Sequence, residues 1–145
     1  MIAVDTNVVL RYLLQDDRNQ SRKANALFAG EEKILITDIV LVETIWTLRG
    51  KRYQLSREAL VEVLYCLIEE PNVMFEDGQA VWCALDDTIN AKPVKVRGKI
   101  KQADFADALI LNKARRYGAK RKLRVHPLYT FDKGALEIDG TQEPQ

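Results

Sequence analysis

Four acidic side chains are candidates for chemistry: Asp5, Glu43, Asp107 and Asp132, of which Glu43 lies about a turn and a half into a predicted helix. Asp5 and Asp132 each follow a short β-prone run, and in parallel sheets the functional crevice lies beyond the carboxyl ends of the strands. Carboxylates crowded into one crevice repel one another unless protons or cations neutralise them. Hard divalent cations such as Mg²⁺ prefer oxygen ligands and leave room for phosphate oxygens. These residues therefore predict metal-assisted hydrolysis of a phosphodiester bond.

Other residue types with catalytic potential are scarce. The single histidine, His126, excludes a mechanism that needs two imidazoles. The two cysteines, Cys66 and Cys83, exclude a zinc finger and a disulfide scaffold, and we expect both to be small buried apolar side chains. The carboxylates are left as the groups that carry the chemistry.

Asp104 complicates the acidic set because it lies three residues before Asp107, on the same face of a predicted helix. Its carboxylate is either a further metal ligand or a cap for the start of that helix. We favour Asp107 as the ligand and keep Asp104 as a secondary member of the site.

The hydrophobic pattern predicts short strands that alternate with amphipathic helices. This alternation is typical of an α/β fold with a small parallel sheet flanked by helices. Segment 92–101 contains Pro93 and Gly98, and we interpret it as a loop or a weak edge strand. Tyr12, Trp46 and Trp82 occupy positions typical of a helical core. The expected strands are 2–4, 34–37, 73–75 and 128–131, and the expected helices are 6–14, 18–29, 38–49, 57–70, 79–91 and 103–117, the last closed by Gly118.

The length of 145 residues and mass of 16.6 kDa fit one domain. We expect this domain to span residues 1–138 and the polar tail, 139–145, to be frayed. No apolar stretch approaches the roughly 18 residues of a membrane-spanning helix. Asp5 interrupts the first apolar run, which does not fit an export signal. We therefore expect a cytoplasmic protein that does not contact a membrane.

The net charge of +1 conceals two unlike regions. Segment 92–124 holds twelve Lys and Arg against Asp104 and Asp107, which gives +10. The remainder holds ten basic and nineteen acidic residues, which gives −9. The basic residues either are solvated side chains at helix ends or contact a phosphate backbone.

The run Val4-Asp5-Thr6-Asn7-Val8-Val9-Leu10 resembles the opening motif of the PIN-domain nucleases. Glu43, Asp107 in Ala-Asp-Ala-Leu-Ile, and Asp132 in Tyr-Thr-Phe-Asp match the remaining acids of that family. The resemblance covers residues 1 to about 136 and is greatest to the VapC-type toxins of toxin–antitoxin pairs. It implies a PIN-like α/β/α sandwich.

The resemblance also implies a function and partners. The activity would be that of an endoribonuclease that requires Mg²⁺ or Mn²⁺, with RNA as substrate. The implied protein partners are a cognate antitoxin and a second copy of the chain in a homodimer. The metal ligands carried over are Asp5, Glu43, Asp107 and Asp132. Asn7 and Thr130 match neighbouring polar positions, and we expect both to orient carboxylates by hydrogen bonding.

Two alternatives remain at this stage. A Mg²⁺-dependent phosphatase or phospho-acceptor receiver domain also places aspartates at strand ends, but it needs a second acid beside the nucleophile, where this chain has Thr6-Asn7. A non-catalytic RNA-binding or scaffold domain is the second alternative, and the presence of all four acids disfavours it.

Overall fold

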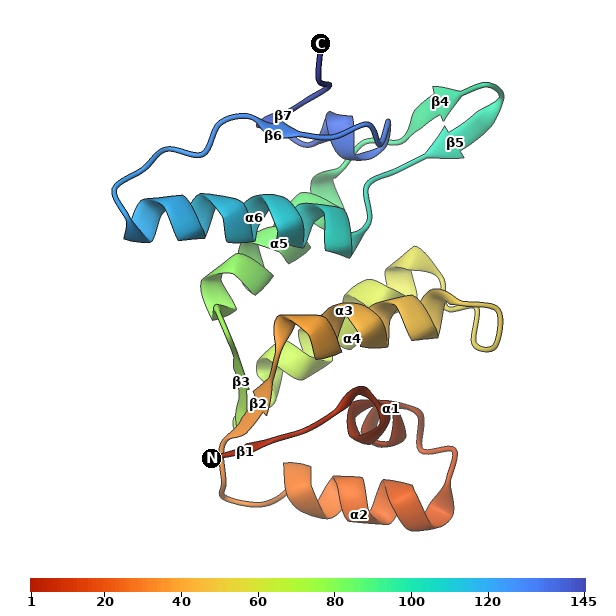
Figure 1. The fold of residues 1–145 in the computed structure, drawn as a ribbon. Helices are drawn as coiled ribbons and strands as arrows, with labels where there is room; N and C mark the ends of the chain where they lie inside the picture. Colours follow the sequence, from red (N-terminus) through yellow and green to blue (C-terminus); the bar gives the residue numbers. More distant parts are fainter. The chain divides into compact units, whose positions relative to one another are not determined.

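The computed structural model describes residues 1–145, which form two compact units, Met1–Glu76 and Asp77–Gln145 (Figure 1). Together the units contain six α-helices and a small parallel sheet, so the predicted α/β class is confirmed. None of the helices is both long enough and apolar enough to cross a membrane.

The first unit contains the parallel sheet, in the order β1-β2-β3. Its strands are β1 (Ile2–Ala3), β2 (Ile34–Ile36) and β3 (Val73–Phe75). Ile34 lies opposite Ile2 on one side and opposite Val73 on the other. Because β2 is the central strand, Ile34 and Ile36 are fully buried and form the centre of this unit's core.

Four helices complete the first unit, and each begins at a capping side chain. The side chains of Asp5, Asp17, Thr37 and Ser56 each accept a hydrogen bond from the backbone N–H three residues later. Such a bond satisfies one of the amides that a helix start leaves unpaired. The helices are α1 (Thr6–Leu14), α2 (Arg18–Phe28), α3 (Asp38–Arg49) and α4 (Arg57–Glu69).

The second unit is built around two helices that pack against each other, α5 (Gly78–Asn90) and α6 (Phe105–Lys120). Their small buried residues, among them Ala84 and Ala108, allow close approach, and Leu85 and Leu111 fill the interface. The other elements are β4 (Val94–Val96), β5 (Lys99–Lys101), β6 (Leu128–Tyr129), the 3₁₀ turn η1 (Ala135–Glu137) and β7 (Thr141–Gln142).

Segment 92–101 forms an antiparallel hairpin of β4 and β5 rather than a loop or a lone edge strand. The turn residues Arg97 and Gly98 both have positive φ, 50° and 79°. Two-residue hairpin turns use this conformation because it matches the twist of the flanking strands. The Arg-Gly pair was thus the hairpin signal in a stretch whose charge and Pro93 suggested a loop.

The prediction that Gly118 ends the last helix is wrong, because α6 continues to Lys120. Gly118 instead permits a close approach by the chain that follows the helix. A Cβ atom at this position would lie 2.6 Å from the carbonyl oxygen of Leu123 and 2.8 Å from Cγ2 of Val125. The glycine is therefore required by tertiary packing rather than by helix termination.

The last predicted strand is shorter than expected and has a different partner. β6 pairs in parallel with β7, so the two form a small sheet within the second unit rather than a continuation of β1–β3. The expected fraying is wrong for Thr141 and Gln142, which form β7. Backbone hydrogen bonds of 2.9 Å hold this pairing at Leu128 and Thr130.

Three apolar or sulfur-containing side chains are more exposed than predicted. Trp46 and Trp82 are each 52% exposed, and Cys66 is also exposed. Trp46 and Trp82 each follow a buried residue of their helix by one position, and Cys66 directly precedes the buried Leu67. One position turns a side chain by about 100° around the helix axis. Trp46, for example, comes directly after the buried Ile45. Tyr12, by contrast, stacks on Phe28 as a core residue does.

Asp77 is a buried carboxylate that the sequence did not single out. Its Oδ1 accepts the N–H of Ala80 as the cap of α5, and its Oδ2 lies 2.9 Å from Nε of Arg116 and 3.6 Å from Nζ of Lys120. Burial alone would raise the pKa of Asp77. The hydrogen bond from Arg116, the cap and the two cations outweigh burial and hold that pKa below its ordinary value.

Two substitutions of Asp77 distinguish the contribution of its charge to stability from the contribution of its helix cap. Asp77→Asn keeps a cap acceptor and should lower the free energy of unfolding by about 1–2 kcal/mol at pH 7, whereas Asp77→Ala should cost about 1 kcal/mol more. Because the folded pKa is depressed, the contribution of the charge is present above about pH 4 and disappears as the pH falls through the folded pKa. Urea unfolding of both variants from pH 3 to pH 8 measures this, and a constant difference across that range would contradict it.

Candidate functional site

Asp5 and Glu43 lie in the first unit and are linked through Thr6. Asp5 directly precedes α1, and its Oδ1 accepts the N–H of Val8 at 2.9 Å. The hydroxyl of Thr6 donates to Oε2 of Glu43 at 2.7 Å. Thr6 is buried, whereas Asp5 and Glu43 are exposed. The buried hydroxyl thus fixes Glu43 of α3 relative to the start of α1.

The role of Thr6 was missed by the sequence analysis. Its signal was its place between Asp5 and Asn7, because a residue at the start of a helix can turn its side chain toward a neighbouring element. Asn7 lies exposed in the first turn of α1 and lines a groove with Asp5 and Arg11. The predicted orienting role of Asn7 stays a prediction.

Asp104 and Asp107 form a reciprocal capping box at the start of α6. Oδ1 of Asp104 accepts the N–H of Asp107 at 2.9 Å, and Oδ2 of Asp107 accepts the N–H of Asp104 at 3.0 Å. Each carboxylate thereby satisfies a backbone amide that would otherwise be unpaired. The cap that the sequence analysis considered for Asp104 is present, and both carboxylates are held in fixed positions.

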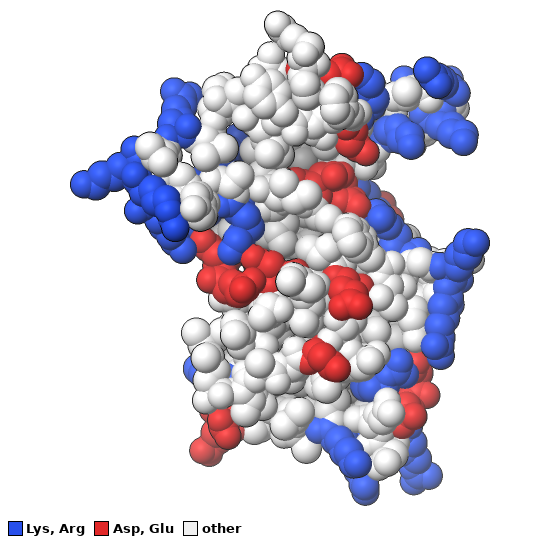
Figure 2. Space-filling view, in the orientation of Figure 1, with Lys and Arg blue, Asp and Glu red and all other residues white.

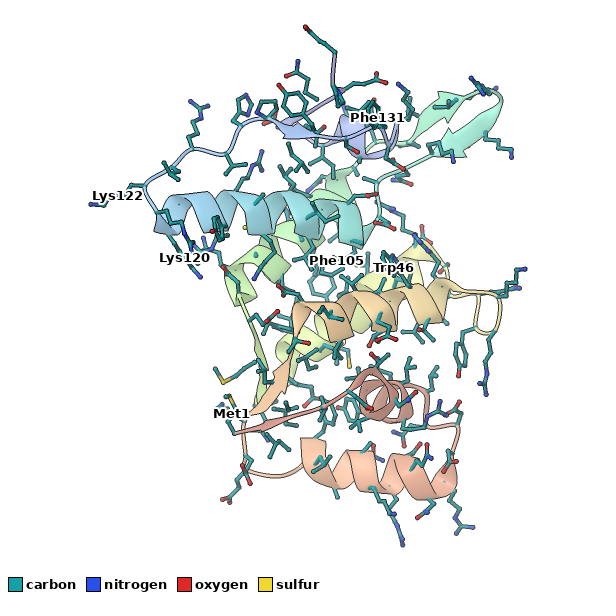
Figure 3. The ribbon with its side chains drawn as sticks, viewed as in Figure 1. Met1, Trp46, Phe105, Lys120, Lys122 and Phe131 are labelled. Atoms are coloured by element: carbon teal, nitrogen blue, oxygen red, sulfur yellow. The ribbon has the colours of Figure 1, made fainter.

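Asp132 lies in the loop after β6, close enough to Asp107 to interact with it electrostatically. Its Oδ1 accepts the N–H of Ala135 at 2.8 Å, and its own N–H donates to the hydroxyl of Thr130 at 3.1 Å. Thr130 therefore shapes the turn that presents Asp132. The neighbouring Phe131 is 73% exposed (Figure 3).

Gly134 explains how this loop reaches the start of α6. A Cβ atom on Gly134 would lie 2.7 Å from the carbonyl carbon of Gln102 and 2.9 Å from the nitrogen of Ala103. The backbone of the loop therefore packs directly on the residues that precede Asp104. The sequence suggested only a turn at Gly134, and its role as a contact point between distant segments needed the tertiary structure.

The electrostatic environment of Asp107 consists of other acids. Burial raises the pKa of Asp107, and the negative charges of Asp104 and Asp132 raise it further, while the N–H of Asp104 opposes this. The result is a pKa of about 6. Asp77, in the same unit, has a lowered pKa because Arg116 and Lys120 lie beside it. Asp107 thus lacks the neutralising partner that the fold supplies to Asp77.

The carboxylates have oxygen atoms available to a ligand. Asp5, Glu43 and Asp132 each use one oxygen in a hydrogen bond to the protein, and the other makes none. An anchored carboxylate with a free oxygen suits a hard divalent cation, which binds oxygen ligands. Within this structure no group of three or more His, Cys, Asp or Glu side chains has metal-binding geometry. The donor chemistry fits Mg²⁺ or Mn²⁺.

Basic residues cluster at two places in the second unit (Figure 2). One is the β4–β5 hairpin, which carries Lys95, Arg97, Lys99 and Lys101 without an acidic residue. The other is the C-terminal end of α6 and the loop after it, where Lys120 and Lys122 lie (Figure 3). The +10 segment therefore occupies both ends of the same helix, and its hairpin directly precedes Asp104.

Comparison with known proteins places this arrangement in a family. No curated protein sequence matches the chain. The model of the PIN domain family matches residues 2–140, nearly the whole chain. PIN domains are generally nucleases, act on nucleic acid and use divalent metal ions. Because the match covers the four acids in both units, this chain belongs to the PIN domain family.

Proposed function

We propose that this protein is an endoribonuclease that requires Mg²⁺ or Mn²⁺ and cleaves RNA phosphodiester bonds with Asp5, Glu43, Asp107 and Asp132 as its metal ligands. The observation that carries the proposal is the cluster of acids at the start of α6, where the capping box holds Asp107 against Asp104 and where Asp132 lies near enough to raise the pKa of Asp107. A like-charged cluster of this kind is stabilised when a cation binds. In a family of nucleases, that cation would assist the hydrolysis of the phosphodiester bond.

The residues of the chain have distinct parts in this proposal. Asp5, Glu43, Asp107 and Asp132 are the metal ligands. Thr6 positions Glu43, and Thr130 with Gly134 positions Asp132. Asp104 positions Asp107 through the capping box and adds negative charge beside it. A bound divalent ion supplies activation of water and neutralisation of charge on the phosphate.

Mutation of Asp5 should abolish cleavage without disturbing the fold. Asn is as good a helix cap as Asp, so Asp5→Asn keeps the bond to Val8 and removes only the charge. We expect the rate of RNA cleavage in Mg²⁺ to fall by about a hundredfold or more, as the loss of a metal ligand requires. Gel analysis of a structured RNA, with and without EDTA, measures the rate.

Asp17→Asn is the matched control, because Asp17 caps α2 by the same hydrogen bond but lies outside the proposed site. Its cleavage rate should equal that of the wild type. Cleavage that survives both EDTA and Asp5→Asn would overturn the mechanism. RNA binding without turnover in any divalent ion would favour a scaffold domain. Formation of an aspartyl-phosphate from acetyl phosphate would favour a receiver or phosphatase.

The proposed site should cost stability when it holds no metal. An acid whose folded pKa lies above its unfolded pKa destabilises the protein at neutral pH, and stability rises as the pH falls from about 7 to about 4. Asp107→Asn should therefore raise the free energy of unfolding by about 1 kcal/mol at pH 7.5 in EDTA, a figure reduced for partial exposure. The gain should vanish near pH 4.

Asp77→Asn should change the free energy of unfolding in the opposite direction. Because Asp77 has cationic partners, loss of its charge should destabilise the protein. Urea unfolding of both variants in EDTA makes the comparison. Destabilisation by Asp107→Asn at neutral pH would contradict a like-charged environment at Asp107.

We further propose that the protein is the cytoplasmic toxin of a toxin–antitoxin pair, that it binds a cognate antitoxin and that it forms a homodimer. We also keep the domain bounds 1–138 and the tail 139–145 as a proposal. Support comes from the resemblance of the chain, over residues 1 to about 136, to VapC-type toxins. Induced expression in a bacterial host should arrest growth, and Asp5→Asn should not. Growth arrest by both proteins, or by neither, would contradict the toxin role.

A further inference from the structure

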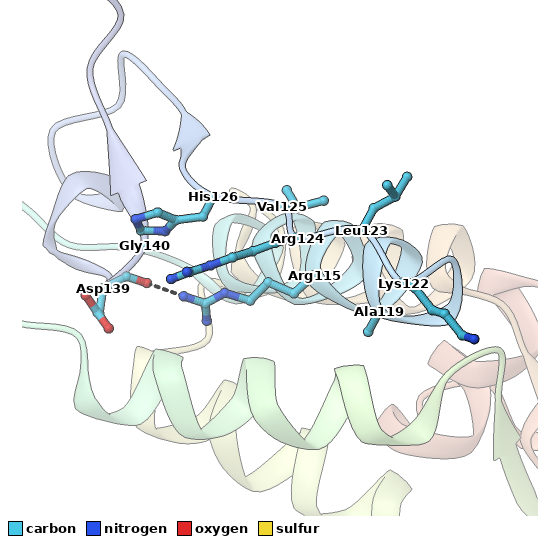
Figure 4. Close-up of a pocket in the computed structure, with 9 residues that line it drawn as sticks. All are labelled: Arg115, Ala119, Lys122, Leu123, Arg124, Val125, His126, Asp139 and Gly140. Atoms are coloured by element: carbon cyan, nitrogen blue, oxygen red, sulfur yellow. Dashed lines mark hydrogen bonds between the residues drawn. The ribbon is translucent and has the colours of Figure 1, made fainter.

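A basic pocket lies in the second unit between the C-terminal half of α6, the loop that follows it and the chain before β7 (Figure 4). Its volume is about 560 Å³. Its polar lining comes from Arg115, Lys122, Arg124, His126 and Asp139. The lining thus includes three cationic side chains and one carboxylate, which gives a formal charge of +2 with His126 neutral.

The loop that forms one wall of the pocket is held to the helix. The N–H of Leu123 donates to the carbonyl oxygen of Gly118 at 2.9 Å, and that of Lys122 donates to the carbonyl oxygen of Ala119 at 3.1 Å. The absence of a Cβ atom at Gly118 lets Leu123 and Val125 approach this closely. The wall is therefore part of the fold and not a free segment.

The opposite wall fixes Arg115. Its Nη2 donates to the carbonyl oxygen of Asp139 at 2.7 Å (Figure 4). A Cβ atom on Gly140 would lie 2.2 Å from the same Nη2, and Gly140 has a φ of 93°, which side-chain-bearing residues rarely adopt. Gly140 thus leaves the space that the guanidinium occupies. Arg115 is presented in one position, with donors to spare for a ligand.

The cations of the pocket are not those that stabilise the helix end. Basic residues near a helix C-terminus commonly interact with its unpaired carbonyls. Here Arg121 donates to the carbonyl of Tyr117, and Lys120 pairs with Asp77. Lys122 and Arg124 lie beyond the helix, and their side chains make no hydrogen bond or ion pair. Their charges are available to a ligand.

The pocket is separated from the proposed catalytic acids. Arg115 and Ala119 lie eight and twelve positions after Asp107 on α6, which corresponds to about 12 Å and 18 Å along the helix axis. A phosphate group in the pocket is therefore not the group that is cleaved. A single strand of nucleic acid has further phosphates at regular intervals, and one of these can occupy the pocket while another is cleaved.

We propose that this pocket binds a backbone phosphate of single-stranded RNA away from the scissile bond, with Arg115, Lys122 and Arg124 as its ligands. The proposal rests on the proposed ribonuclease function for the identity of the strand. Arginine side chains donate in pairs to phosphate oxygens, and the side chains of Lys122 and Arg124 make no ion pair within the protein. Such contacts add affinity and register without sequence preference.

Binding can be measured without cleavage, which separates this proposal from the nuclease proposal. The probe is a fluorescein-labelled single-stranded RNA of about 12 nucleotides in EDTA, titrated at about 50 and 200 mM NaCl. Lys122→Gln/Arg124→Gln should weaken binding about tenfold at the lower salt concentration and reduce the salt slope by about 1.4, or 0.7 for each lost contact.

The matched control is Arg18→Gln/Arg22→Gln, which removes the same charge from the exposed surface of α2. Its affinity and salt slope should remain those of the wild type. Gly140→Ala gives a second test, because it displaces Arg115 without changing the net charge. Circular dichroism establishes that each variant is folded. If Gly140→Ala unfolds the protein, the glutamine pair decides the question.

The changes in backbone amide NMR signals on addition of RNA locate the binding site. RNA should shift the signals of Leu123, Arg124 and Gly140, and inorganic phosphate should shift the same signals more weakly. Unchanged RNA affinity in the glutamine pair, an equal loss in the control pair, or the absence of RNA binding by the wild type would each overturn the proposal. So would an oligoglutamate peptide that binds as tightly as the RNA. Pocket-dependent RNA binding in a protein that does not cleave RNA would support this proposal while refuting the nuclease.

Discussion

Repulsion among carboxylates at the start of α6 is the constraint on which the arrangement of the second unit depends. Asp107 lies beside Asp104 and Asp132, and its pKa of about 6 reflects burial and this shared negative charge. The fold opposes the repulsion with directed hydrogen bonds. The capping box fixes Asp104 and Asp107, and the backbone of the Gly134 loop packs on Gln102 and Ala103 so that Asp132 reaches them. If no cation bound there, removal of one of these negative charges would increase the stability of the protein.

The same kind of interaction therefore supports the structure and, in the function that we propose, also holds the metal ligands. Asp side chains cap α1, α2, α5 and α6, and each cap satisfies a backbone amide. What differs is the rest of the carboxylate's surroundings. Asp77 has Arg116 and Lys120 beside it and is a structural ion pair, whereas Asp107 has acids beside it. The positive charge of the second unit instead lies on the β4–β5 hairpin and in the pocket beyond α6, where a phosphate backbone can meet it.

Most elements were predictable because their signals are local. The apolar periodicity locates the four helices of the first unit to within a residue or two. The sequence predictions were wrong where the environment of a residue is set by a part of the chain that is distant in sequence. Gly118 looked like a helix end but accommodates Leu123, and Trp46 looked like core but lies one position off the buried face of α3. The strand before Asp132 pairs with β7, a partner that no local pattern specifies.

The sequence by itself determined the chemistry of this protein. Its residue types predict hydrolysis by carboxylates and a divalent cation, and the order of its motifs indicates the PIN family, to which the chain belongs; both inferences depend on the residues themselves. Only the tertiary structure decided how those residues are held. Thr6 binds Glu43 across 37 positions, Gly134 brings a distant loop to the start of α6, and Gly140 makes room for Arg115. These contacts depend on the close approach of backbone segments that are far apart in the chain. A pattern of residue types along the sequence does not specify which distant segments lie close together in space.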